Sequence, residues 1–365
     1  MHEWIFFLVP ALAFAVTVGC GRLLPAFAWR VGLLDHPDGI RKRHERPVPL
    51  VGGLAVVAGV ATVSFLEPAR LGWSFVGGAC VPLVLSGFLL IGLWDDLHEP
   101  PAGVRFLLEG LLVIAVLSTG GFAIRDLGSI AGPFPFELGP ASLPFTFLAL
   151  LGFVNAVNFL DGLDALAAGV GWVSWLWLAV LAFVGGFGPL AVVALAWLGA
   201  LLAYLPFNLG LHPRLLPKIF LGDSGSLLLG AALALFALTL HRVFVGMPLS
   251  PPAMVYAWIL GYPVLDALAV IARRVLRGRN PMRPDRSHLH HLLLARGLSR
   301  RRVAFLLTFV AFSYGLVGIL GWYVLGLNDE ALVLLFLLAA ASQTVLALRL
   351  GRGAGLEVTP GAEGG

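Results

Sequence analysis

The chain has 365 residues, of which 59% are hydrophobic and only 12% are charged, and its mean hydropathy is +0.93. A soluble domain carries about 25% charged residues, so this composition excludes a water-soluble globular enzyme, a disordered protein and a nucleic-acid-binding module. Because a membrane-spanning helix uses about 20 apolar residues, the composition predicts an all-α, polytopic integral membrane protein. The net charge of +4 is less informative than the positions of the charges.

Apolar runs between polar or Gly/Pro-rich breaks predict about ten or eleven transmembrane helices. In chain order they lie near 4–28, 51–67, 75–93, 104–119, 143–158, 170–184, 190–206, 225–241, 253–272, 303–325 and 331–350. The Gly/Pro-rich segment 120–142 is too polar to span and predicts a small hairpin outside the bilayer. We expect residues 1–350 to form one polytopic transmembrane domain, which would also carry any catalytic function, and the Gly-rich residues 351–365 to form a disordered cytoplasmic tail.

The distribution of lysine and arginine predicts the orientation of these spans. Of the 24 basic residues, 20 fall in loops on one side and three on the other, at Arg70, Arg125 and Arg242. Cytoplasmic loops carry an excess of Lys and Arg. The basic loops are therefore predicted to be cytoplasmic, with the N-terminus outside, and the protein is expected to be a multi-pass protein of the inner (plasma) membrane.

Five aspartates fall at or just beyond the predicted cytoplasmic ends of spans. They are Asp95, Asp96, Asp161, Asp164 and Asp223. An ionised carboxylate near the hydrocarbon costs several kcal/mol unless it is paired, hydrated or bound to a metal. Any one of them could simply end its helix at the interface. Because the outward helix ends carry no comparable cluster, the five together predict a functional site.

Two of the acidic motifs predict a wet cleft at this face. Asp95 and Asp96 are adjacent at a helix end, where one could reach a metal or a reacting proton while the other supports it. Asn155, Asn158 and Asp161 are spaced three apart, so that each neighbours the next on a helix surface. This stripe begins inside an apolar run, which is costly unless it faces water.

The motif Phe220-Leu-Gly-Asp-Ser-Gly-Ser226 leads directly into an apolar span. Its Asp and Ser could serve only as helix N-caps. Alternatively, the N–H groups around Gly222 and Ser224 could hold a phosphate, with Asp223 holding the Mg²⁺ that the phosphate brings. No Cys/His set with zinc-ligand spacing is present in the sequence.

Two basic segments could contact an anion. Arg286, His288, His290 and His291 form a dense cluster in the loop 273–302, which could bind a transition metal, remain a solvated loop or hold an anionic substrate. The surrounding arginines favour binding of an anion such as a nucleotide diphosphate. Residues 42–44 of the first basic loop, Lys42, Arg43 and His44, form a second basic arm, or only the positive-inside signal.

Together these motifs resemble the polyprenyl-phosphate N-acetylhexosamine-1-phosphate transferases. The matching stretches are Asp35-His-Pro-Asp38 with Arg41-Lys-Arg-His44, Pro49-Leu-Val-Gly-Gly53, Asp95-Asp96, 155–169, 220–226 and His288-Leu-His-His291, in family order over about residues 30–300. The Arg-Lys-Arg-His and His-x-His-His patterns resemble the WecA/TagO branch more than the MraY branch. Such enzymes transfer a sugar 1-phosphate from a cytoplasmic UDP-sugar to a membrane lipid phosphate and release UMP.

The resemblance implies roles for the candidate residues. Asp223 would be the main ligand of Mg²⁺, or of Mn²⁺ in its place, and Asp95 and Asp96 would orient or deprotonate the lipid phosphate. Asp161 and Asp164 would complete the catalytic set. The nucleotide-sugar would be bound by the remaining candidates, which are Lys42, Arg43, His44, Asn155, Asn158, Gly222, Ser224, Arg286, His288, His290 and His291.

The expected partners are a UDP-N-acetylhexosamine, undecaprenyl or another polyprenyl phosphate, and membrane lipids; apolar outer helix faces would also allow a homodimer. The expected transferred group is N-acetylglucosamine 1-phosphate. A MraY-type transfer of phospho-MurNAc-pentapeptide, another UDP-sugar and, more distantly, an ion-coupled transporter are the alternatives. Three residues depart from the family pattern: Ala165 replaces a glycine, and Arg105 and Glu109 stand where Lys and Gln are expected.

Overall fold

The computed structural model of the chain describes residues 3–37, 46–66, 80–132, 134–276, 278 and 288–351. The predicted basic arm (Lys42, Arg43, His44), Arg286 and the predicted tail beyond residue 351 lie outside these ranges. The described elements are α1 (Ile5–Val31), β1 (Leu34–Asp35), β2 (Val48–Pro49), α2 (Gly52–Leu66), α3 (Cys80–His98), α4 (Ala102–Ser118), the 3₁₀-helix η2 (Gly139–Ala141), α5 (Ser142–Leu160), α6 (Leu166–Val184), α7 (Gly188–Asn208), α8 (Gly222–Phe244), α9 (Ala253–Ile259), α10 (Gly261–Leu276), α11 (Leu289–Ala295), α12 (Arg300–Tyr323) and α13 (Asp329–Gly351).

The helical membrane architecture is confirmed. Within the described ranges, eight helices are long and apolar enough to cross a membrane, and the bent pair α9–α10 would make a ninth span. The second and fourth predicted ranges fall on α2 and α4, which are shorter, with 15 and 17 residues. Each of the eleven predicted ranges therefore coincides with a helix or with this bent pair.

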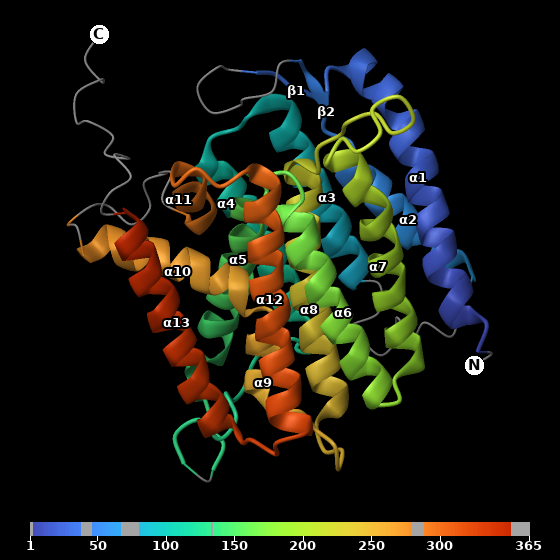
Figure 1. Ribbon diagram of the computed structural model, residues 1–365. Helices are drawn as coiled ribbons and strands as arrows, with labels where there is room; N and C mark the ends of the chain where they lie inside the picture. The colour runs from blue at the N-terminus through green and yellow to red at the C-terminus, as the bar shows by residue number, and fades with distance from the viewer. Residues whose placement is uncertain are drawn as a thin grey trace.

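The helices run between two ends of the bundle, here called the β1–β2 end and the α9 end (Figure 1). At the β1–β2 end lie the two short strands, which pair antiparallel with Leu34 opposite Pro49, and the helix α11. The α9 end carries the segment 120–142, where Asp126 bridges Glu137 as in the predicted hairpin. Large apolar side chains such as Phe7, Leu83 and Phe305 are exposed on the sides of the bundle, as a lipid-facing surface requires.

The bend of 75° between α9 and α10 has a local cause. Pro263 lacks the N–H that would donate to the carbonyl of Ile259 four residues earlier, so the helix cannot continue straight. The Ser174 hydroxyl of α6 donates to that carbonyl at 3.2 Å instead. As a result α10 lies across the bundle while α12 and α13 run along it (Figure 1).

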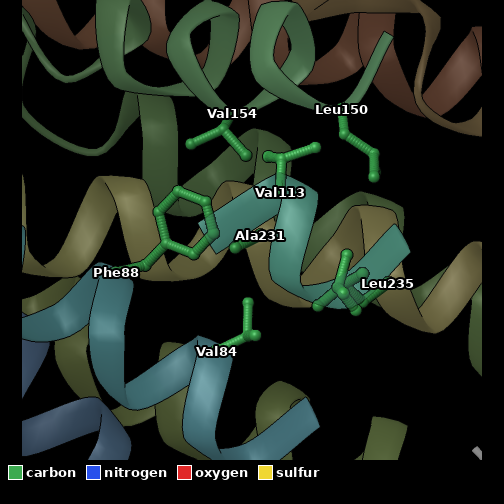
Figure 2. A pocket seen from close by; sticks show the side chains of 8 residues that line it. Val84, Phe88, Val113, Leu150, Val154, Ala231 and Leu235 are labelled. Atoms are coloured by element: carbon green, nitrogen blue, oxygen red, sulfur yellow. The ribbon is translucent and has the colours of Figure 1, made fainter. Parts of the chain in front are cut away.

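Helix α8 forms the centre of the bundle. It packs against α2, α3, α5 and α6, and nearly all of its apolar side chains are buried. Figure 2 shows a small void beside it, lined by apolar side chains of α3, α4, α5 and α8, among them Val84, Val113, Leu150 and Leu235. The bundle interior around this void, which side chains of α3, α4, α5 and α8 line, is therefore an apolar core.

Candidate active site

The structure brings aspartates from three distant parts of the chain together at the β1–β2 end. Asp95 and Asp96 are on the last turn of α3, Asp161 directly follows α5, and Asp223 is on the first turn of α8. Asp223 lies close enough to Asp95 for their carboxylates to repel one another. Asp161 experiences the charges of Asp223, Asp96 and Asp164. The predicted acidic cluster thus exists as a spatial cluster.

Glycines bring these helices into close contact. A Cβ atom added to Gly92 of α3 would collide with the backbone of Ser224, and one added to Gly53 of α2 would collide with the backbone of Gly225. The N–H of Gly52 also donates to the Phe220 carbonyl at 2.8 Å. The Gly-Gly pair after Pro49 and the glycine in α3 therefore serve to seat the start of α8 between α2 and α3.

Asp96 caps the N-terminus of α8. Its carboxylate accepts hydrogen bonds from the backbone N–H groups of Asp223 at 2.8 Å and Ser224 at 3.1 Å. The Ser224 side chain is fully buried. In this structure the Ser224 N–H is therefore donated to Asp96 and is not free for a phosphate, because a carboxylate of α3 occupies this helix terminus. The predicted phosphate contact of Gly222 stays a prediction.

Asp95 begins a buried chain of polar contacts through α3, α4 and α5. Arg105 donates to the Asp95 carboxylate at 2.5 Å, and its Nε lies 3.3 Å from Glu109 Oε1. Glu109 is fully buried and accepts a hydrogen bond from Asn155 Nδ2 at 2.5 Å. Asn155, expected to bind substrate, is only 3% exposed. It supports Glu109 from inside the bundle, and the expectation of direct substrate contact is corrected accordingly.

Asn158 holds the side chain of Asp223. Its amide donates to the Asp223 carboxylate and, at 2.9 Å, to the Ser226 hydroxyl. The Ser226 hydroxyl in turn donates to the Gly222 carbonyl at 3.0 Å. The stripe predicted on α5 therefore does face the acidic cluster, through Asn158.

The loop between α5 and α6 carries the remaining two acids. Burial raises the pKa of Asp161 well above its usual value, and the neighbouring carboxylates of Asp223, Asp96 and Asp164 raise it further. Lys218 lies 2.7 Å from the Asp164 carboxylate, a pairing that the sequence did not indicate. The loop ends at Ala165, which has a φ of +66° and donates its N–H to Asn208.

The histidine cluster lies on and before α11. His288 is 2.8 Å from Asp266 of α10, and its ring lies 5.6 Å from that of Phe159. His290 is only 1% exposed, so the structure does not present it to a substrate as expected. Burial lowers the pKa of His290 to about 3, with a further contribution from His291. His290 is thus a neutral, buried side chain at physiological pH.

The residues at the cluster fit a divalent cation whose other ligands are water and substrate oxygens. Within the described ranges, no group of three or more His, Cys, Asp or Glu side chains converges on one point. Carboxylates such as those of Asp95 and Asp223 nevertheless lie close together, and repulsion between them favours a cation. Mg²⁺ keeps several waters and binds one or two carboxylates together with substrate phosphates.

Comparison with known proteins identifies the family. Residues 79–241 match the family model described as glycosyl transferase family 4, and all five clustered aspartates fall inside that match. The chain is similar to proteins named undecaprenyl-phosphate alpha-N-acetylglucosaminyl 1-phosphate transferase in Yersinia pestis (32% identical, covering 86% of this chain and 83% of that one), Haemophilus influenzae (34%, covering 81% of each) and Escherichia coli strain K12 (32%, covering 86% and 83%). With its helical membrane fold and its assembled acidic cluster, the chain belongs to glycosyl transferase family 4, and it is a multi-pass membrane transferase.

Proposed function

We propose that the chain transfers N-acetylglucosamine 1-phosphate from UDP-N-acetylglucosamine to undecaprenyl phosphate and releases UMP. The observation that carries the proposal is the convergence of Asp95, Asp161 and Asp223 at one end of a membrane bundle, beside Arg105. Relatives that match over more than four fifths of this chain have the acceptor and the transferred group in their names. A cytoplasmic β1–β2 end, as the basic loops predict, would expose this cluster to a nucleotide-sugar.

The reaction joins two anions. An oxygen of the lipid phosphate forms a bond to the β-phosphorus of the donor, and the bond from that phosphorus to the oxygen of UMP breaks, with its electrons leaving on UMP. Because a phosphate monoester has a second pKa near 6, the attacking group needs little help from a base. The protein must mainly position the reactants and offset their charge.

The acidic cluster would hold Mg²⁺ through Asp223, with Asp95 or Asp161 as a further contributor. When bound, the ion would neutralise phosphate charge and polarise a phosphoryl oxygen. Asn158 orients the Asp223 carboxylate, and Asp96 anchors the helix on which Asp223 sits. Arg105 keeps a cationic side chain beside Asp95. These contacts preorganise the site before substrate arrives.

An ion-coupled transporter is a poorer account of these residues. A transporter needs a polar route across the membrane from its intramembrane acids. The void that lies along α8 beyond the acidic cluster is lined entirely by apolar side chains (Figure 2).

A MraY-type donor is disfavoured by the names of the relatives, and a panel of donors separates the two enzymatic readings.

The proposal is tested with the purified protein, undecaprenyl phosphate, Mg²⁺ and UDP-N-acetyl[¹⁴C]glucosamine. We expect label to enter the organic phase with one UMP released per label transferred. UDP-N-acetylgalactosamine and UDP-MurNAc-pentapeptide serve as competing donors. Failure to transfer label from UDP-N-acetylglucosamine, whether or not UMP is released from another donor, would contradict the proposal.

Asp223→Asn is expected to lower the transfer rate at least about 100-fold, because loss of one metal ligand removes several kcal/mol of transition-state stabilisation. The initial rate is measured over a range of Mg²⁺ concentrations. Asp126→Asn, which changes a carboxylate at the α9 end, is the matched control and should leave the rate unchanged. A folded Asp223→Asn protein with near-native Mg²⁺-dependent transfer would exclude the metal role.

A further inference from the structure

A carboxylate outside the acidic cluster contacts the histidine segment. Asp266 lies in α10 and its side chain is only 2% exposed. Its Oδ2 lies 2.8 Å from His288 Nδ1, and its Oδ1 accepts the backbone N–H of Leu289 at 3.0 Å. Both oxygens are therefore committed to the residues that begin α11. A buried aspartate with two such contacts links the bent span to the segment 288–291.

The contact at Nδ1 determines which nitrogen of His288 remains for a ligand. An ionised carboxylate accepts hydrogen bonds and cannot donate them, so Nδ1 must carry the proton that it shares with Asp266. The second nitrogen, Nε2, is then the one that faces other partners, as in carboxylate–histidine pairs at metal and catalytic sites. The bond to Leu289 at the same time fixes the first residue of α11.

The position of the His288 ring places it beside the acidic cluster. The ring lies against Phe159, the second-to-last residue of α5, and stacks on His290 at 5.8 Å between ring centroids. A Cβ atom added to Gly162, the residue after Asp161, would lie 3.4 Å from His290 Nε2. The histidine segment and the Asp161 loop are thus neighbours.

We propose that Asp266 is a positioning residue for the donor site, which fixes the tautomer and the place of His288 so that Nε2 contacts the diphosphate or sugar of a nucleotide-sugar. The inference rests on the proposed function. The inference goes beyond the proposed function because Asp266 lies in an apolar run whose sequence indicates only a membrane span. An intramembrane acid is costly and points to a function when its partner is a site residue.

The kinetic test compares Asp266→Asn and Asp266→Ala with Asp329→Asn. Asp329 is a matched control because it is also buried and both of its carboxylate oxygens also accept hydrogen bonds, here from the backbone N–H groups of Ser129 and Met254 at the α9 end. Both Asp266 variants should lower kcat/KM for the UDP-sugar about 10- to 100-fold, with an unchanged KM for undecaprenyl phosphate. Asp329→Asn should leave these constants unchanged.

A double-mutant cycle separates positioning from general stability. If Asp266 acts through His288, then Asp266→Asn should cause no further loss of activity in a His288→Ala background. An equal fold-loss with and without His288, or native kinetics in both Asp266 variants, would overturn the inference.

A second readout does not depend on transfer. The rate of modification of His288 by diethyl pyrocarbonate is measured by mass spectrometry relative to the exposed His212. Asp266→Ala should raise the rate at His288 several-fold, and an unchanged rate would overturn the inference. If the wild-type protein transfers label from no donor, the proposed function fails, and this rate still decides whether Asp266 restrains His288.

Discussion

Ala165 occupies a backbone conformation that suits glycine. Its φ of +66° lies in the left-handed region, which costs a residue with a Cβ atom about 1 kcal/mol or more. Ala165→Gly should therefore raise the free energy of unfolding by about 1 kcal/mol, measured as a higher apparent melting temperature in detergent. Ala167→Gly, within α6, should lower it, because glycine is unfavourable in a helix interior. Equal effects of the two changes would contradict the assignment of strain.

His290 makes stability depend on pH. Burial lowers its pKa to about 3 in the folded protein; His291 and His288 act in the same direction and Asp266 opposes them. The unfolded chain takes up this proton near pH 6.5, so the contribution of the neutral ring is lost progressively as pH falls from about 6.5 to about 3. At pH 5 the loss amounts to about 2 kcal/mol.

His290→Gln removes this titration. The fall in apparent melting temperature between pH 7 and pH 5 should therefore be smaller in His290→Gln than in the wild-type protein. His212→Gln changes an exposed histidine and should keep the wild-type pH dependence. If the apparent melting temperature of the wild-type protein falls no further between pH 7 and pH 5 than that of His290→Gln, then the pKa of the His290 ring is not lowered in the folded protein.

At the scale of elements, the contact between α3 and α8 decides where the carboxylates lie. Gly92→Ala would place a methyl group against the backbone of Ser224, so α3 must move away from α8. We expect a loss of about 1–3 kcal/mol of stability and at least a tenfold loss of transfer activity, because Asp95 and Asp96 move with α3. Gly152→Ala, on α5 with no atom near the added carbon, is the control and should be tolerated in both assays.

The sequence predicted the elements better than their junctions. Apolar length located α1, α3 and the other long helices, because a bilayer fixes how long an apolar helix must be, but it also predicted spans at α2 and α4, which are only 15 and 17 residues long. The run 253–272 gave no sign of the sharp bend at Pro263. The Ile259 carbonyl that loses its helical partner there accepts a hydrogen bond from Ser174, which belongs to a helix distant in sequence. The cap of α8 by Asp96 and the pairing of Asp266 with His288 were missed for the same reason. The sequence showed which polar residues were present, but their hydrogen-bond partners depend on how distant helices pack together.

At the scale of the whole molecule, the proposed orientation has a direct test. In a protein in which Cys20 and Cys80 are replaced by serine, a single cysteine is introduced at Met247 at the α9 end or at His212 at the β1–β2 end; both positions are exposed. A membrane-impermeant maleimide should label position 247 in intact cells and position 212 only after permeabilisation, because basic loops stay in the cytoplasm. The reverse pattern would place the acidic cluster outside the cell.

The capping of α8 by Asp96 also has a consequence for the order in which the site forms during synthesis of the chain. Its two partners follow it by 127 and 128 residues, so α3 is synthesised and inserted long before the N–H groups that its carboxylate will accept. The histidine segment leaves the ribosome later still. Until α8 is made, Asp96 therefore lacks the two N–H groups that it caps in the folded protein. We therefore expect transfer activity only once most of the chain has been synthesised.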